Sequence, residues 1–295
     1  MTSVGVVAHA EKELGGGLPE LRTTLAGYGI NDPPWHEVRK SKHVPERAQE
    51  LVDRGVDLLF VWGGDGTVQR AIDALVGRPV TIAIVPAGTA NLLATNLGLP
   101  QDLDACVRIG LHGARRSLDV GKVNGEHFAV MAGAGLDAMM IRSADAGLKD
   151  KVGRIAYVWT GVKNVQLEPV RMSIEVDGRS WFEDDASCVL VGNVRDVLGG
   201  LTVFPEAAFD DGRLDVGVVT ADGWWEWART LGRSVLGNVG ASPFVRMTTG
   251  RTIEVRLDEA MPYQLDGGDR KKTKKLKIKV KPGAISVAVP ERGSR

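Results

Sequence analysis

Three glycines, an aspartate and a threonine stand together between an apolar run and a helix-like segment: Gly63, Gly64, Asp65, Gly66 and Thr67. Glycines let a ligand approach the backbone closely, and backbone N–H groups at a helix N-terminus can hold a phosphate. A carboxylate beside bound phosphates needs a bridging cation such as Mg²⁺. The stretch therefore predicts a phosphate-binding turn in which Asp65 organises the cation. The alternative is a structural turn with Asp65 as the helix N-cap.

A second turn of the same kind follows the apolar run 81–85 and contains Gly88, Thr89 and Asn91. Two such turns on adjacent parallel strands would face each other at the carboxyl ends of the sheet, where open α/β sheets bind ligands. We expect the hydroxyls of Thr67 and Thr89 and the amide of Asn91 to contact phosphate or ribose.

A third unit near the start of the chain has the same order of strand, glycines and helix. Lys12 lies between the apolar run 4–8 and the glycines 15–17, and a helical period of leucines follows. Lys12 is therefore a further candidate for contact with a phosphate.

The elements that must position these turns alternate regularly as strand and helix through about residue 115. This alternation predicts an N-terminal doubly wound parallel α/β domain over residues 1–118. Short alternating strands with hairpin signals then predict an antiparallel β-sandwich domain over residues 119–295. The hairpin signals are Asn124-Gly125, Asp177-Gly178 and Asp211-Gly212, and helical interruptions are expected at 151–165 and 224–238.

Composition excludes several classes of protein. With 37 basic and 37 acidic residues in 295, the overall charge gives no reason to expect a nucleic-acid partner. Cys106 and Cys188 stand in apolar surroundings, which predicts buried free thiols in a reducing compartment. No apolar run approaches the ~18–20 residues of a membrane span, and the first residues lack the features of a signal peptide. We expect a cytoplasmic protein, with peripheral association with the inner membrane surface left open.

As an ordered set, these motifs resemble the diacylglycerol kinase catalytic domain family, bacterial lipid kinases whose superfamily includes NAD kinases and phosphofructokinases. The turn at 63–67 is shared across the superfamily, whereas Pro86-Ala87-Gly88-Thr89-Ala90-Asn91 followed by Leu-Leu-Ala is similar to the lipid-kinase branch. The resemblance continues over nearly the whole chain, at residues 133–138, 152–157, 191–193, 199–200, 205 and 210–215.

The resemblance implies an ATP- and Mg²⁺-dependent lipid kinase that transfers the γ-phosphoryl group to a lipid hydroxyl. Diacylglycerol is the family's default acceptor, and a sphingoid base or another long-chain alcohol remains open. ATP would lie in the cleft between the two domains. The family's structural Mg²⁺ site would correspond to Asp211 with the main chain of Ala208 and Arg213. An ordinary Asp-Gly turn explains Asp211 equally well.

The general base is where the sequence departs from the family. The family carries Asp-Gly-Glu with the glutamate as base, and Gly268 stands at that position here. Asp269, one residue on, is the first candidate for the base, and Asp266 is the second or a helper of the metal. The alternative is that residues 266–269 form only a hairpin turn. General base catalysis is typically worth about 10²–10⁴-fold, so its loss would not abolish transfer.

A lysine-rich strand is predicted near the C-terminus, where Leu276, Ile278 and Val280 alternate with lysines. The lysine face is interpreted either as a solvated, edge-protecting face or as a surface that binds anionic lipid headgroups. Trp224, Trp225 and Trp227 could line an acyl-chain pocket or pack between domains. A homodimer is left open.

Two other functions remain as alternatives. A soluble NAD kinase-like enzyme would share the first glycine turn. An assay that compares phosphorylation of NAD with phosphorylation of lipid would distinguish it. A nucleotide-binding regulatory protein with little catalysis is suggested by Gly268. It would bind ATP without turnover on any lipid.

Overall fold

The computed structural model of the protein describes residues 2–135, 169–197, 201–222, 226–227, 229–230, 233 and 239–291. The chain divides into two compact units. The first contains Met1–Leu118 and the segment from Gly283 onward, and the second contains Asp119–Pro282. The sequence-based boundaries differ here, because they assigned all of 119–295 to the second domain. The last strand returns to the first unit, where Ser286 and Val287 pair in parallel with Thr81 and Ile82.

The first unit is built on a parallel sheet with strands in the order β2–β1–β3–β4, followed by the end of β16. Neighbouring strands pair in parallel throughout. The strands are β1 (Val4–His9), β2 (Trp35–Val38), β3 (Leu58–Gly63), β4 (Thr81–Pro86) and β16 (Gly268–Val289). Every residue of β1 and β3 is buried, as expected for a parallel sheet that is covered on both faces.

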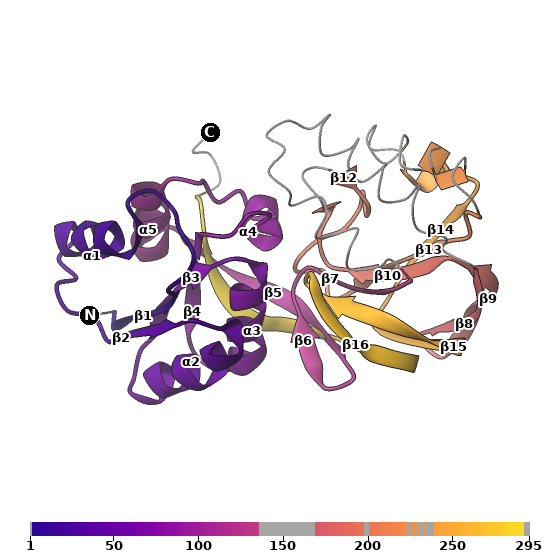
Figure 1. Cartoon of the computed structure of the whole chain (residues 1–295), viewed down its shortest axis with the longest axis horizontal. Helices are drawn as coiled ribbons and strands as arrows, with labels where there is room; N and C mark the ends of the chain where they lie inside the picture. Colours follow the sequence, from indigo (N-terminus) through magenta and orange to yellow (C-terminus); the bar gives the residue numbers. More distant parts are fainter. Residues whose placement is uncertain are drawn as a thin grey trace. The chain divides into compact units, whose positions relative to one another are not determined.

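Helices cover both faces of this sheet. Figure 1 shows α1 and α5 on one face and α2 and α3 on the other. The helices are α1 (Gly17–Gly27), α2 (Val44–Asp53), α3 (Asp65–Leu75), α4 (Leu92–Asn96) and α5 (Leu103–His112), with a 3₁₀ turn η1 (Ser41–His43). In α2 the buried positions Val44, Ala48, Leu51 and Val52 follow the helical period. The predicted doubly wound α/β domain is confirmed.

The second unit is antiparallel and rich in hairpins. Its strands are β5 (Ala114–Val123), β6 (Glu126–Phe128), β7 (Met131–Ala134), β8 (Val170–Val176), β9 (Arg179–Ala186), β10 (Cys188–Gly192), β11 (Asp196–Val197), β12 (Leu201–Thr202), β13 (Leu214–Val219), β14 (Val245–Gly250) and β15 (Thr252–Leu265), with the 3₁₀ turn η2 (Val239–Ala241). The strands β5 and β16 each contribute residues to both units.

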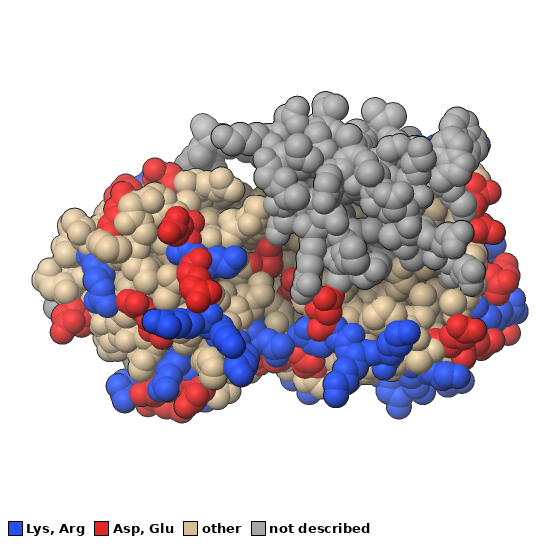
Figure 2. Space-filling view, viewed as in Figure 1, with Lys and Arg blue, Asp and Glu red and all other residues tan. Residues whose placement is uncertain are grey.

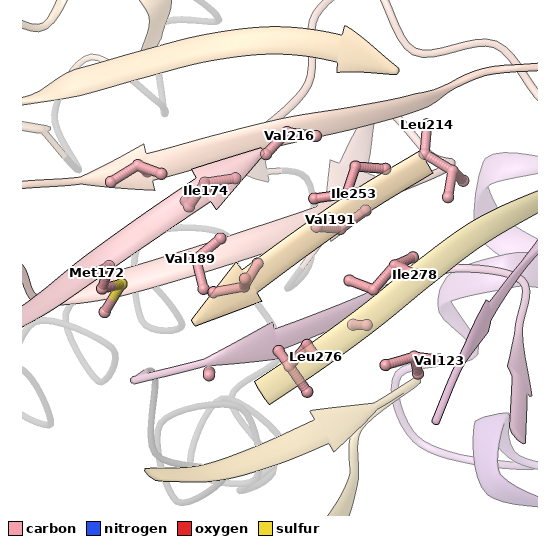
Figure 3. Packing of buried hydrophobic residues seen from close by; sticks show 14 of the residues in the cluster. Val123, Met172, Ile174, Val189, Val191, Leu214, Val216, Ile253, Leu276 and Ile278 are labelled. Atoms are coloured by element: carbon pink, nitrogen blue, oxygen red, sulfur yellow. The ribbon is translucent and has the colours of Figure 1, made fainter. Parts of the chain in front are cut away.

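The long strand β15 joins the two layers of the sandwich. Its first part pairs with β8, and its last part, Tyr263–Leu265, pairs with β7 in the row β14–β13–β10–β7–β15. Register shifts between Arg256 and Tyr263 separate the two parts, as a β-bulge does. Figure 3 shows the core between the layers, where Ile174 and Ile253 from one pack with Val189, Val191 and Val216 from the other. The predicted β-sandwich is confirmed.

Several sequence expectations fall partly or wholly outside the described residues. The helix expected at 151–165 lies outside them, as do Trp224 and Trp225 and the family-like residues 136–138, 152–157 and 199–200. Of the helix expected at 224–238, residues 226–227, 229–230 and 233 are helical, and Trp227 is buried. Both cysteines are buried free thiols, as predicted. Among the described helices, none is long and apolar enough to cross a membrane.

Candidate functional site

The two glycine turns lie side by side because their strands are neighbours. The strands β3 and β4 pair in parallel, and Gly63 at the end of β3 is in register with Pro86 at the end of β4. Directly beyond them, the Ala87 N–H donates to the Gly63 carbonyl at 3.0 Å. The two turns therefore meet at the carboxyl edge of the sheet, as the sequence predicted.

Gly64 and Gly88 bring the backbones of the two turns into contact. A Cβ atom built on Gly64 would lie 3.1 Å from the Gly88 Cα, and one built on Gly88 would lie still closer to the Gly64 Cα. The Gly88 Cβ would also lie 2.8 Å from the Asn91 Oδ1. A side chain at position 88 would clash with the first turn, and one at position 64 would be in tight contact with the second. The result is a bare backbone surface at the start of α3, which is the form of a phosphate cradle.

Asp65 is the first residue of α3 and ties the first turn to the second. Gly64, not Asp65, is the N-cap residue of α3, so the predicted structural alternative is wrong in that detail. The Asp65 Oδ1 accepts a hydrogen bond of 2.6 Å from the Leu92 N–H, at the start of α4. Asp65 is half-buried and holds the second turn against the first.

Thr67 and Asn91 are buried, which differs from the expectation that they would face a ligand. Thr67 is 2% exposed, and its hydroxyl lies 3.2 Å from the Ser41 hydroxyl. Asn91 is in the left-handed conformation at φ 48°. Its Oδ1 accepts from the Gly88 N–H at 3.0 Å, and its Nδ2 donates to the carbonyls of Pro86 and Gly88. Asn91 therefore shapes the turn, whereas Thr89 and Gly66 are exposed.

Lys12 follows β1 at the same edge of the sheet. Its carbonyl accepts a hydrogen bond of 3.0 Å from the indole N–H of Trp62, which is fully buried in β3. Burial and the neighbouring Lys12 ammonium lower the pKa of His9. Lys12 therefore places one ammonium group near His9, in the loop that follows β1.

In the second unit, Asp266 and Gly267 form the two-residue turn between β15 and β16. Both have positive φ, 44° and 78°, which is the pattern of a type I′ hairpin turn. The Asp266 carboxylate is 3% exposed and accepts hydrogen bonds of 2.9 Å from the N–H groups of Ala129, Val130 and Met131. Those oxygens hold the hairpin onto the start of β7, so Asp266 has a structural task and is not poised to accept a proton.

Asp269 is the exposed carboxylate of this hairpin. It is the second residue of β16, opposite Gln264 and two residues beyond the turn. A Cβ atom on Gly268 would lie 3.0 Å from the Arg270 Nη1, so the Arg270 guanidinium lies over the position where the family carries glutamate. Arg270 donates to both Glu126 carboxylate oxygens at 2.7–3.0 Å and to the carbonyls of Gly268 and Asp269. Glu126 and Arg270 thus clamp the strand that carries Asp269.

The predicted metal residues lie in the loop before β13. Asp211 is exposed, and its Oδ1 accepts from the Arg213 N–H at 2.9 Å. Burial and then the Asp211 and Glu206 carboxylates raise the pKa of the nearby Asp215 to about 6. The described residues contain no group of three His, Cys, Asp or Glu side chains set to hold a metal. The predicted set has one carboxylate with the carbonyls of Ala208 and Arg213, and these all-oxygen donors suit Mg²⁺.

Sequence reasoning missed four residues that build these sites. Ser41 follows β2 at the same edge as the glycine turns, and its place after a strand could have indicated it. Asp119 is 2% exposed, and its carboxylate accepts from the Gly212 N–H at 2.6 Å, which positions the 209–212 loop. Glu126 and Arg270 are far apart in the sequence, and nothing local to either residue indicated their ion pair.

Comparison with protein families matches the two units to two models. Residues 18–123 match the diacylglycerol kinase catalytic domain, and residues 130–289 match the YegS C-terminal NAD kinase beta sandwich-like domain. The chain is 29% identical over 225 residues to the diacylglycerol kinase of Bacillus subtilis, covering 75% of this chain and 74% of that protein. It is 32% identical over 246 residues to the "Probable lipid kinase YegS-like" of Pseudomonas aeruginosa, covering 82% and 80%.

Solved structures give the same result for the fold. A crystal structure assigned as a diacylglycerol kinase from Bacillus anthracis superposes with a TM-score of 0.82 at 27% identity, covering 97% of this chain and 96% of that one. An NAD kinase from Archaeoglobus fulgidus in complex with ATP superposes with a TM-score of 0.54 at 12% identity, covering 97% and 92%. The second likeness concerns the fold alone.

Proposed function

Because this chain belongs to the lipid kinase family that combines a diacylglycerol kinase catalytic domain with a YegS-type C-terminal domain, we propose that it transfers the γ-phosphoryl group of ATP to the hydroxyl of diacylglycerol. The observation that carries the proposal is the backbone contact of Gly64 with Gly88 at the start of α3. A site free of Cβ atoms suits the close approach of a polyphosphate. We assign the reaction to the cytoplasmic face of the membrane, where ATP meets lipid.

The first unit would bind and orient the donor. The backbone of residues 63–67 and the turn at Gly88 would cradle the phosphates, with Thr89 exposed beside them. Asp65 would hold the two turns in their mutual position through Leu92 and contribute a carboxylate to the cation that accompanies ATP. Lys12, at the end of β1, would add positive charge at the same edge.

When bound, Mg²⁺ neutralises the negative charge of the phosphates during phosphoryl transfer. Asp211 with the carbonyls of Ala208 and Arg213 would hold a second, structural ion in the loop that Asp119 positions. This donor set fits a hard cation because all its atoms are oxygens.

Asp269 would act on the acceptor. Asp269 is exposed on the hairpin, and we assign it as the group that takes the proton from the acceptor hydroxyl. The hydroxyl oxygen forms the new bond to the γ-phosphorus, the bond from phosphorus to the ADP oxygen breaks, and the proton goes to the Asp269 carboxylate. Asp266 would contribute only by fixing the hairpin, since three backbone N–H groups occupy its oxygens.

One observation favours a second function, nucleotide binding with little catalysis. Gly268 stands where the family has its glutamate, and the Arg270 guanidinium lies over Gly268. If Asp269 does not serve as base, none of the residues assigned above would accept the proton, and the proposed nucleotide site would bind ATP without efficient transfer.

Transfer of labelled phosphate from ATP tests both functions. Wild-type protein, Asp65→Ala and Asp269→Ala are assayed with Mg²⁺ on diacylglycerol, on a total lipid extract and on NAD. The matched control is Asp258→Ala, which removes an exposed aspartate on the neighbouring strand β15. We expect labelled phosphatidic acid, its loss with Asp65→Ala, a fall of about 10²-fold or more with Asp269→Ala, and no change with Asp258→Ala.

Other outcomes separate the alternatives. A different labelled lipid would show that the acceptor is another alcohol and not diacylglycerol. Labelled NADP would support the NAD kinase-like function. Tight ATP binding with no labelled product on any acceptor would support the regulatory function. Activity unaffected by Asp269→Ala would remove Asp269 as the base.

A further inference from the structure

The first half of β16 carries an unusual concentration of positive charge. Of the twelve residues from 270 to 281, eight are lysine or arginine and none is acidic, in a chain with equal numbers of basic and acidic residues. Leu276, Ile278 and Val280 on the same strand are buried in the sandwich core. Lys277, Lys279 and Lys281 alternate with them and are exposed. These three side chains, the lysine row, stand about 7 Å apart along one face of the sheet.

Protection of a sheet edge does not explain the lysine row. Lysines on an edge strand prevent pairing with another chain. However, β16 is an interior strand, which pairs with β15 on one side and with β5 on the other. Asn124, the residue after β5, exchanges hydrogen bonds with the backbone of Lys277 and also donates to the Lys275 carbonyl. No strand edge is left there for lysines to protect.

Neutralisation by neighbouring carboxylates does not explain the row either. Lys275 pairs with Glu254 at 2.6 Å, and on β15 Arg256 pairs with Glu254 and Glu175. On the adjoining β8, Arg171 lies within ion-pair distance of Glu183 and Asp184. Glu254 also lies opposite Lys277 in the strand register, but its carboxylate pairs with Lys275 and Arg256 and not with Lys277.

Among the described residues, Lys277, Lys279 and Lys281 make no side-chain hydrogen bond or ion pair, and the same holds for Lys271 and Lys272 near the hairpin. Lys279 lies opposite Thr252, which is neutral. Figure 2 shows Lys and Arg side chains gathered along the side of the second unit where Figure 1 draws β16 and β6.

We propose that the lysine row, with Lys271 and Lys272, is the surface by which this protein binds an anionic lipid bilayer. The inference rests on the proposed function, since a lipid kinase must reach an acceptor that stays in the membrane. A flat row of unpaired ammonium groups on a rigid strand matches a flat layer of anionic headgroups. Each lysine at such a surface raises partitioning about five-fold, so the three of the row together contribute about a hundredfold.

Binding to lipid vesicles tests this surface without any catalysis. Wild-type protein is sedimented with phosphatidylcholine vesicles that contain or lack phosphatidylglycerol, in the absence of ATP and diacylglycerol. The test variant is Lys277→Gln/Lys279→Gln/Lys281→Gln. The charge-matched control is Arg171→Gln/Arg179→Gln/Arg256→Gln, three exposed arginines on β8, β9 and β15 of the same sandwich. The thermal unfolding midpoint of each variant verifies that it folds.

We expect the wild type to prefer the anionic vesicles in a salt-sensitive manner, the lysine variant to lose about a hundredfold in partitioning, and the arginine control to keep it within a few-fold. The lysine variant should also phosphorylate detergent-dispersed lipid normally while losing rate on vesicles. Equal binding of wild type to neutral vesicles, equal losses in both variants, or a lysine-dependent affinity for single-stranded RNA without vesicle binding would overturn the proposal. A protein that shows the expected vesicle binding yet transfers no phosphate would refute the proposed function and leave this surface standing.

Discussion

The Asp65 carboxylate accepts a hydrogen bond of 2.6 Å from the Leu92 N–H, so the first glycine turn holds the second. In the sequence these turns are two separate motifs on two strands. In the folded protein they form one surface, because the carboxylate joins the start of α3 to the start of α4. Asp65 therefore has a structural role, which can be tested separately from any contact with a cation.

Two substitutions at Asp65 separate those parts. Asp65→Asn keeps an oxygen for the Leu92 N–H but removes the charge, so we expect the stability to change by less than about 1 kcal/mol while transfer falls about 10²-fold. Asp65→Ala also removes the hydrogen bond and should cost about 1.5–3 kcal/mol of stability. Urea unfolding and phosphate transfer measure the two effects. Equal stability losses in both variants would contradict a structural role for the acceptor oxygen.

Gly88→Ala tests the contact between the two turns. The new methyl group would meet the Gly64 Cα and the Asn91 Oδ1, so the turns must separate. We expect ATP binding to weaken at least tenfold and stability to fall by about 1–3 kcal/mol. Gly27→Ala is the matched control, because a Cβ atom at Gly27 meets nothing within 4 Å. Titration calorimetry with ATP measures the first effect, and unchanged affinity in Gly88→Ala would remove the turns from the nucleotide site.

Asp266→Ala tests the task of the buried hairpin carboxylate. The change leaves the N–H groups of Ala129, Val130 and Met131 buried without an acceptor, which should cost about 3 kcal/mol or more. Asp177→Ala is the matched control, since Asp177 also begins a hairpin at positive φ and accepts from the N–H groups of Arg251 and Thr252, but is exposed to water. It should cost about 1 kcal/mol. Denaturant unfolding compares the two, and an equally mild loss at both positions would return Asp266 to the candidates for the base.

The pair of Glu126 and Arg270 should affect turnover more than substrate binding. Arg270 is 13% exposed and Glu126 31%, so breaking the pair should cost about 2 kcal/mol. If the clamp positions Asp269, Arg270→Gln should lower kcat about tenfold with KM for lipid within two-fold. Glu126→Gln should give the same result, and the double variant should be no worse than either single variant. Additive losses in the double variant would show that the two residues act independently.

Local features of the fold were predictable because a few adjacent residues encode them. Apolar runs that end in glycine turns predicted the parallel strands and the helices that follow. Asn-Gly and Asp-Gly pairs predicted the hairpins at Asn124 and Asp177, because these residues accept the positive φ that a type I′ turn requires. The ordered motifs also predicted the family that the comparisons confirm.

Features that depend on residues far apart could not be read in this way. Nothing near Asn91 indicates that its amide turns inward onto Pro86 and Gly88, and nothing near Arg270 indicates its partner Glu126. The burial of Thr67 against Ser41 likewise depends on how β2 ends beside α3.

Backbone preference and hydrophobic period act over a few residues, so the sequence was enough to predict most elements, the hairpins at Asn124 and Asp177, and the family. Strand order and register choose the partner of each polar side chain, so these partners were not predictable before the fold was known. The tertiary structure committed Asp266 to three backbone N–H groups and left Asp269 exposed. It also placed β16 inside a sheet, where its lysines have no edge to protect.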